Sequence, residues 1–195
     1  MIVMNKRTVN IAIVGIMSAL ATVAYMLLPE IPLVPGVDYL KIDISVIPVV
    51  LTGISFGIPS GIAVSVIKNL IHLTRTTTFG IGECMDVLIG ITMVIAMRAV
   101  IRALMRRKGA VKYGPREYYI ATAVCIAATV VVGWLANAAL TPLYFHIAGF
   151  PLTAETLMAG VWGSTLLNVV KSAVTTIPFY PLARAINIAA AKIGY

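Results

Sequence analysis

Long apolar segments separated by short polar connections are the feature that most constrains the fold of this chain. Hydrophobic residues make up 60% of its 195 residues, and only 11% are charged. Soluble domains carry about 25% charged residues, whereas a helix of about 20 apolar residues spans the hydrocarbon core of a bilayer. The composition and the segment lengths therefore predict an integral membrane protein, surrounded by the lipid bilayer.

We interpret six segments as transmembrane helices, approximately residues 8–28, 44–56, 60–74, 83–98, 118–140 and 155–176. Residues 29–43 contain prolines and a glycine that prevent a helix, so we predict an outer loop that is able to fold back as a lid. No linker or long repeat interrupts the series. We therefore expect an all-α protein in which residues 1–195 form a single membrane domain, a bundle of six transmembrane helices.

The basic residues define the expected orientation in the membrane. Most of the 15 Lys and Arg residues fall in three stretches, residues 6–7, 98–116 and 184–192, and of the 7 acidic residues only Glu117 lies next to one of them. Lys and Arg concentrate in cytoplasmic loops, so we predict that both the N- and C-termini and the connection at 107–116 are cytoplasmic. Because topology accounts for the net charge of +8, we predict no nucleic-acid partner.

Several kinds of reactive site are missing from the sequence. It contains no phosphate-binding Gly-x-x-x-x-Gly-Lys-Ser/Thr loop, no His-Glu-x-x-His and no Gly-x-Ser-x-Gly. Cys84 and Cys125 have no metal-ligand spacing and are predicted to be free thiols, and His72 and His146 alone are a weak metal signal. No acidic residue occupies the middle of a predicted span, which argues against proton coupling. We therefore predict neither an enzyme nor a catalytic residue, metal site or cofactor.

Two polar residues stand out in the last predicted span. A lysine at mid-membrane costs roughly 2.5–3.5 kcal/mol, yet Lys171 lies well inside this segment. Asn168 precedes it by three residues, so both side chains share one face of a helix. We expect that face to look into the protein, either as a clasp between helices or as part of a ligand pocket.

Other polar residues are expected to converge with this pair in the outer half of the bundle. They are Asp38, Lys41, Lys68, Glu83, Asp86 and Asn137, and the same segments carry Tyr39, Phe79, Trp134 and Trp162. Apolar and aromatic walls with a few placed polar groups are typical of a small-molecule pocket. Lys68 and His72 are expected near the outer end of their helix, where a lysine can extend its charge to the interface.

Several short motifs of the chain resemble one transporter family. They are Leu40-Lys-Ile-Asp43 followed by Ile47-Pro48, the block Ile67-Lys-Asn-Leu-Ile-His-Leu73, Gly82-Glu83 followed by Leu88-Ile-Gly90, Asn137, and Asn168-x-x-Lys171. With them the sequence resembles the substrate-binding S-components of energy-coupling factor (ECF) vitamin transporters, and within these the riboflavin-specific branch. The resemblance covers approximately residues 8–190.

The resemblance implies a six-helix subunit of a prokaryotic plasma membrane that binds riboflavin or a related flavin near the outer face. It implies partners as well, a transmembrane coupling subunit and two cytosolic ATPase subunits, whose ATP hydrolysis drives uptake. Gly15-x-x-x-Ala19 occupies the place of the family's Ala-x-x-x-Ala contact with the coupling subunit. The absence of a phosphate-binding loop agrees with an ATPase on other chains.

The resemblance also implies the residues that bind the flavin. Asn137, Asn168 and Lys171 correspond to contacts with the edge of the isoalloxazine ring. Contacts with the ring or the ribityl chain are implied for Asp38, Tyr39, Leu40, Lys41 and Glu83. Asp86 stands where many relatives are expected to carry an amide, so no role is carried over to it. Two alternatives stay open: an S-component for another vitamin such as pantothenate, and a small facilitator that works without partners.

Overall fold

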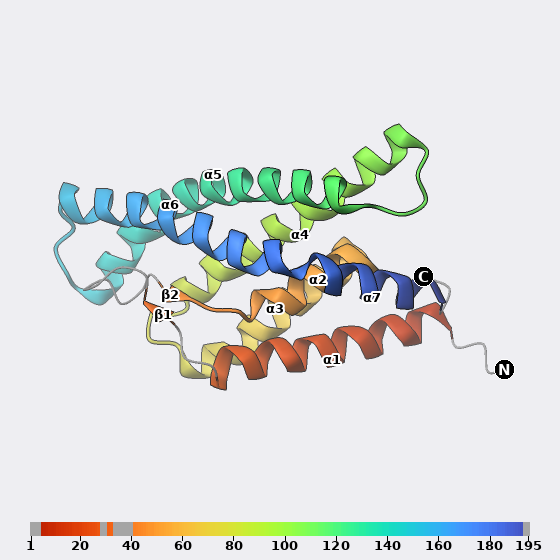
Figure 1. Ribbon diagram of the computed structural model, residues 1–195. Coiled ribbons are helices and arrows are strands. Elements are labelled where there is room, and N and C mark those ends of the chain that lie inside the picture. Colours follow the sequence, from red (N-terminus) through yellow and green to blue (C-terminus); the bar gives the residue numbers. More distant parts are fainter. Residues whose placement is uncertain (1–4, 28–30, 33–40, 193–195) are drawn as a thin grey trace.

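The computed structural model describes residues 5–27, 31–32 and 41–192, and within them it is almost entirely helical (Figure 1). The α-helices are α1 (Lys6–Leu27), α2 (Val46–Phe56), α3 (Ile58–His72), α4 (Ile81–Lys108), α5 (Pro115–Ala148), α6 (Ala154–Thr176) and α7 (Tyr180–Lys192). Short 3-10 turns at Leu73–Arg75 and Ile177–Phe179 follow α3 and α6. The prediction of an all-α chain is thus confirmed for the described residues, apart from one short β-ribbon.

That ribbon lies in the segment that was predicted to be a loop. Strand β1 (Ile31–Pro32) pairs antiparallel with β2 (Lys41–Ile42), with Ile31 opposite Ile42. The ribbon leads directly into Asp43 and the start of α2, at the end of the bundle where α5 and α6 are connected (Figure 1). The ribbon therefore sets the position of the polar residues that lie just before α2.

Helix ends follow the local sequence, with one exception. Gly57 separates α2 from α3 in a positive-φ conformation (φ 114°), and α4 and α5 both end at left-handed glycines, Gly109 and Gly149. Helix α4 continues beyond the predicted span of residues 83–98, along a row of arginines, and ends only at Lys108. The predicted end of the fifth span near residue 140 was too early, because α5 continues through Pro142 to Ala148.

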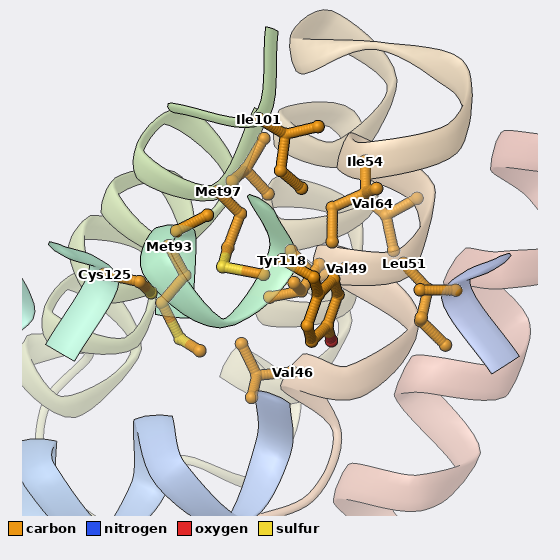
Figure 2. Packing of buried hydrophobic residues seen from close by; sticks show 14 of the residues in the cluster. Val46, Val49, Leu51, Ile54, Val64, Met93, Met97, Ile101, Tyr118 and Cys125 are labelled. Atoms are coloured by element: carbon orange, nitrogen blue, oxygen red, sulfur yellow. The ribbon is translucent and has the colours of Figure 1, made fainter. Parts of the chain in front are cut away.

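The apolar core is centred on α2 and α4. Figure 2 shows Val46, Val49 and Ile54 of α2 packed against Met93 and Met97 of α4, and Tyr118 and Cys125 of α5 complete the cluster. Small residues let these helices approach closely, as is common between helices in membranes. A Cβ atom at Gly53 would lie 2.6 Å from Cγ1 of Val94, and one at Gly61 would lie 2.8 Å from Cα of Gly53.

Four helical segments are long and apolar enough to cross a membrane: Lys6–Leu27, Ile81–Lys108, Pro115–Ala148 and Ala154–Ala191. Helix α2 is apolar but shorter. Large apolar side chains are exposed on these segments, for example Ile11 (73%), Leu135 (69%) and Leu166 (51%). Exposed apolar surface of this kind is expected where lipid replaces water as the surroundings of a helix.

The contact between α2 and α3 gives a first prediction. Gly61→Ala should lower the free energy of unfolding by about 1–3 kcal/mol, because the added methyl group meets backbone atoms that are unable to rotate away. Thermal unfolding of the purified protein in detergent measures the effect. Gly15→Ala is the matched control, because a Cβ atom there meets nothing within 4 Å. Equal unfolding temperatures for the two variants would contradict the prediction.

Candidate functional site

A cavity of about 430 Å³ opens between the ends of α1 and α3, the beginning of α4, the end of α5 and the middle of α6. Its volume lies within the range of about 300–1,000 Å³ that is common for small-molecule sites. Aromatic and apolar side chains, among them Tyr25, Tyr144 and Phe145, form part of its walls, and charged and amide side chains form another part. The cavity thus has the composition of a binding site for a small organic molecule.

Four buried charged residues meet at one part of the cavity, which we call its floor: Asp43, Asp86 and Lys171 line the cavity, and Lys68 is ion-paired with the two carboxylates. The Nζ atom of Lys171 lies 2.7 Å from Oδ2 of Asp43 and 2.6 Å from Oδ1 of Asp86. The Nζ atom of Lys68 lies 2.7 Å from Oδ2 of Asp86 and 3.7 Å from Oδ1 of Asp43. Each lysine therefore bridges both carboxylates, and the four residues close a ring with no net formal charge. We call Asp43, Lys68, Asp86 and Lys171 the charge ring.

Neighbouring polar groups support the charge ring. The backbone N–H of Ser45 donates to Oδ1 of Asp43 at 2.8 Å, and the Ser45 hydroxyl accepts from Lys68. The amide of Asn69 donates to Oδ2 of Asp86 at 2.9 Å, and the ring of Tyr25 lies 4.6 Å from Nζ of Lys68. Buried charges are tolerated when they are paired and hydrogen-bonded, and these contacts satisfy that condition.

The position of Lys68 corrects an expectation from the sequence. Lys68 does not extend to the membrane surface, because its side chain is 0% exposed and ion-paired. The carboxylates that hold it come from the start of α2 and from α4, so no local pattern around Lys68 reveals them. The same contacts give Asp86 a role that the sequence left unassigned, since it binds both lysines of the charge ring.

The charge ring also limits what Lys171 can offer to a ligand. A lysine side chain has three N–H donors, and two of those of Lys171 are directed at Asp43 and Asp86. One donor remains for a molecule in the cavity, and the positive charge is already balanced by two carboxylates. Lys171 is therefore suited to donate a hydrogen bond to an uncharged acceptor.

Two asparagine amides lie on the wall above the charge ring. Asn137 of α5 and Asn168 of α6 both line the cavity and are only 6% and 3% exposed. The Asn137 amide donates to the backbone oxygen of Gly133 at 2.8 Å. The structure thus brings together Asn137, Asn168 and Lys171, the three residues that were predicted to bind one edge of a ligand.

Glu83 lines the opposite side of the cavity and is fixed by several contacts. One carboxylate oxygen lies 2.8 Å from Nδ1 of His72, and the other accepts a hydrogen bond from the hydroxyl of Thr76 at 2.9 Å. The ring of His72 stacks on that of Tyr25, with 3.7 Å between their centroids. Glu83 therefore links α4 to the end of α3, and through His72 to the end of α1.

Part of the predicted site lies outside the described residues. Asp38, Tyr39 and Leu40 belong to this part, and Lys41 is described only by its backbone in β2. Trp134 and Trp162 do not line the cavity but form an exposed edge-to-face pair between α5 and α6. Sequence reasoning missed the aromatic side chains that do line it, because Tyr25 and Tyr144 lie near helix ends far apart in the chain.

The structure also places the cysteines and the small residues of α1. Cys84 and Cys125 are free thiols, as predicted. Over residues 5–27, 31–32 and 41–192, no group of three or more His, Cys, Asp or Glu side chains is placed to hold a metal ion. Gly15 and Ala19 lie on an exposed face of α1, beside the exposed side chains of Ile16 and Leu20. This face is open to a partner, although nothing in the chain itself identifies one.

Comparison with known proteins connects this chain to a transporter family. The family model described as "ECF transporter, substrate-specific component" matches residues 9–183. The chain is 25% identical over 178 residues to the riboflavin transporter RibU of Lactococcus lactis subsp. cremoris (strain NZ9000), with 91% of this chain and 82% of the relative covered. It is 28% identical over 180 residues to RibU of Staphylococcus aureus (strain TCH60), with 92% and 89% covered.

Two further similarities agree with these. The riboflavin transporter FmnP of Bacillus subtilis (strain 168) is 26% identical over 175 residues, and 87% of each chain is covered. A solved structure described as "Structure and mechanism of the S component of a bacterial ECF transporter" superimposes with a TM-score of 0.69 and 25% identity. The superposition covers 97% of this chain and 99% of that one. Sequence and fold therefore point to the same family.

The charge ring leads to a prediction about stability. Lys68→Met should lower the free energy of unfolding by about 3–5 kcal/mol, because it leaves two buried carboxylates to share one lysine. The measurement is thermal unfolding of the purified variant in detergent without ligand. Lys112→Met, at an exposed position, serves as the control and should unfold like the parent protein. If Lys68→Met also unfolds at the parent temperature, the charge ring does not stabilise the fold.

Proposed function

Because the chain belongs to the family of substrate-specific components of ECF transporters, we propose that it is a membrane subunit that binds riboflavin or a related flavin for uptake. The observation that carries the proposal is the convergence of Asn137, Asn168 and Lys171 on one cavity of suitable size. Relatives named riboflavin transporters, each aligned over most of both chains, give it independent support.

The chemistry of the cavity suits the isoalloxazine ring of a flavin. One edge of that ring alternates carbonyl acceptors with an N–H donor, and an asparagine amide carries both a donor and an acceptor. Lys171 adds a single donor above a floor with no net formal charge. The aromatic side chains of Tyr25, Tyr144 and Phe145 supply flat apolar surface. In this proposal Asn137, Asn168 and Lys171 bind the ring edge.

Glu83 is proposed to bind the hydroxyl groups of the ribityl chain, as a fixed carboxylate acceptor on the opposite side of the cavity. Asp38, Tyr39, Leu40 and Lys41 remain proposed contacts on the strength of the family resemblance. The charge ring argues against pantothenate as the ligand at this floor, because pantothenate carries a carboxylate and Lys171 is already paired with two. Burying a further anion there would leave its charge uncompensated.

We further propose the topology and the partners that the family implies. Helices α2 and α3 complete a single domain with six membrane spans, and the arginine-rich end of α4 faces the cytoplasm together with both termini of the chain. The exposed Gly15–Ala19 face of α1 contacts a transmembrane coupling subunit. Because the sequence has no phosphate-binding loop, ATP is hydrolysed by two cytosolic ATPase subunits. The subunit resides in the plasma membrane of a prokaryote.

Binding by the purified protein tests the ligand. Riboflavin fluorescence should be quenched on addition of the protein, and Asn168→Ala or Lys171→Ala should raise the Kd about tenfold or more. Each change leaves a polar group of the bound ligand without its partner, at a cost of about 1–3 kcal/mol, and Lys171→Ala also removes a member of the charge ring and should lower stability. Asn187→Ala on α7, outside the cavity, is the control. Unchanged affinity in Asn168→Ala would remove this residue from the site, and no quenching by the parent protein would contradict the proposed ligand.

Uptake into vesicles tests the partner surface. Gly15→Leu should leave riboflavin affinity unchanged and strongly reduce uptake, because a large side chain keeps the coupling helix at a distance. Gly15→Ala, which keeps the residue small, should transport like the parent protein. Uptake by the chain alone, without coupling and ATPase subunits, would instead support a facilitator that works without partners.

A further inference from the structure

The two amides of the cavity meet at one residue, Gly133, which is buried in the middle of α5. The backbone oxygen of Gly133 accepts the hydrogen bond from the Asn137 amide, at 2.8 Å. The Asn168 amide, which arrives from α6, lies against Cα of the same residue. Its nitrogen lies well within contact distance of the place that a Cβ atom at 133 would take, and its Cγ atom lies 3.1 Å from that place.

From this geometry we propose that Gly133 is a positioning residue of the ligand site, which sets the Asn168 amide in the cavity. The proposal deepens the flavin-binding function and rests on it. Gly133 acts by having no side chain. Any larger residue would overlap the volume that the Asn168 amide fills. Asn137 bonds to a backbone atom of Gly133, which a change of side chain at 133 retains. Such a change should therefore displace the Asn168 amide and leave the Asn137 hydrogen bond intact.

The surroundings of Gly133 differ from those of the other closely packed glycines of α2 and α3. A Cβ atom at Gly53 or Gly61 meets Val94, and at Gly61 it also meets backbone atoms. These contacts concern helix packing. The three atoms nearest to a Cβ atom at Gly133 all belong to the amide group of Asn168, the end of a side chain that can rotate. Alanine at 133 should therefore move the amide and leave the helices in place.

The helix propensity of alanine sharpens the distinction between positioning and packing. Glycine destabilises the interior of a helix relative to alanine, so Gly133→Ala should stabilise α5. The Asn168 side chain can rotate away from the added methyl group. A purely structural role predicts stability and binding that change together. Positioning predicts that the unfolding temperature without ligand is kept or raised while the affinity for riboflavin falls.

The experiment measures both quantities on the full-length purified protein. Riboflavin Kd comes from fluorescence quenching, and the unfolding temperature is taken without ligand. We expect Gly133→Ala to raise the Kd about tenfold, close to the effect of Asn168→Ala, with no fall in unfolding temperature. Ala127→Val, which adds methyl groups on the exposed side of α5, is the control and should change neither quantity.

A double-mutant cycle shows whether Gly133 acts through Asn168. In the presence of Asn168→Ala, the added Gly133→Ala change should have no further effect on the Kd, since the amide to be displaced is gone. If Gly133→Ala lowers the unfolding temperature, the same comparison still shows whether its effect on the Kd depends on Asn168. A further loss of affinity in the double variant, or parent affinity in Gly133→Ala alone, overturns the positioning role and leaves flavin binding standing. Failure of the parent protein to bind riboflavin overturns both.

Discussion

Four charged side chains, buried where a membrane protein is expected to be apolar, determine how the rest of this structure is arranged. A single buried lysine or aspartate would be costly, but each member of the charge ring has two partners of opposite sign. The ring joins the start of α2 to α3, α4 and α6, so it closes the bundle below the cavity. It is stable only as a complete set, because removing one member leaves uncompensated charge.

The charge ring also defines the chemistry of the cavity above it. Lysine is often taken as a group that attracts anions, yet Lys171 presents one remaining donor and a balanced charge. In the proposed site, the groups that would distinguish one ligand from another are consequently the uncharged amides of Asn137 on α5 and Asn168 on α6, which line the cavity. A site of this kind distinguishes ligands by their pattern of hydrogen-bond donors and acceptors, and only weakly by their net charge.

Features that depend on spacing within one helix could be predicted from the sequence, whereas features that depend on contacts between distant segments were missed. Asn168 and Lys171 were assigned to one interior face because three residues separate them on a helix, and both line the cavity. Lys68 was correctly expected to converge with this pair, but its charge was wrongly expected at the interface, because the carboxylates that hold it buried belong to distant segments. The end of α5 was missed for another reason: Pro142 disfavours a helix locally, but packing within the bundle continues the helix beyond it.

Helix α1 connects the cavity to the exposed surface that the family resemblance assigns to a partner. Tyr25, near its end, lines the cavity and stacks on His72, which in turn contacts Glu83. Gly15 and Ala19 lie on an exposed face of the same helix, away from these contacts. In the proposed function, a helix that carries part of the cavity wall at one end and an exposed face along its length would give a direct connection between ligand and partner. The same arrangement keeps Asn137, Asn168 and Lys171 of α5 and α6 off that face, so affinity and coupling would be set by different side chains.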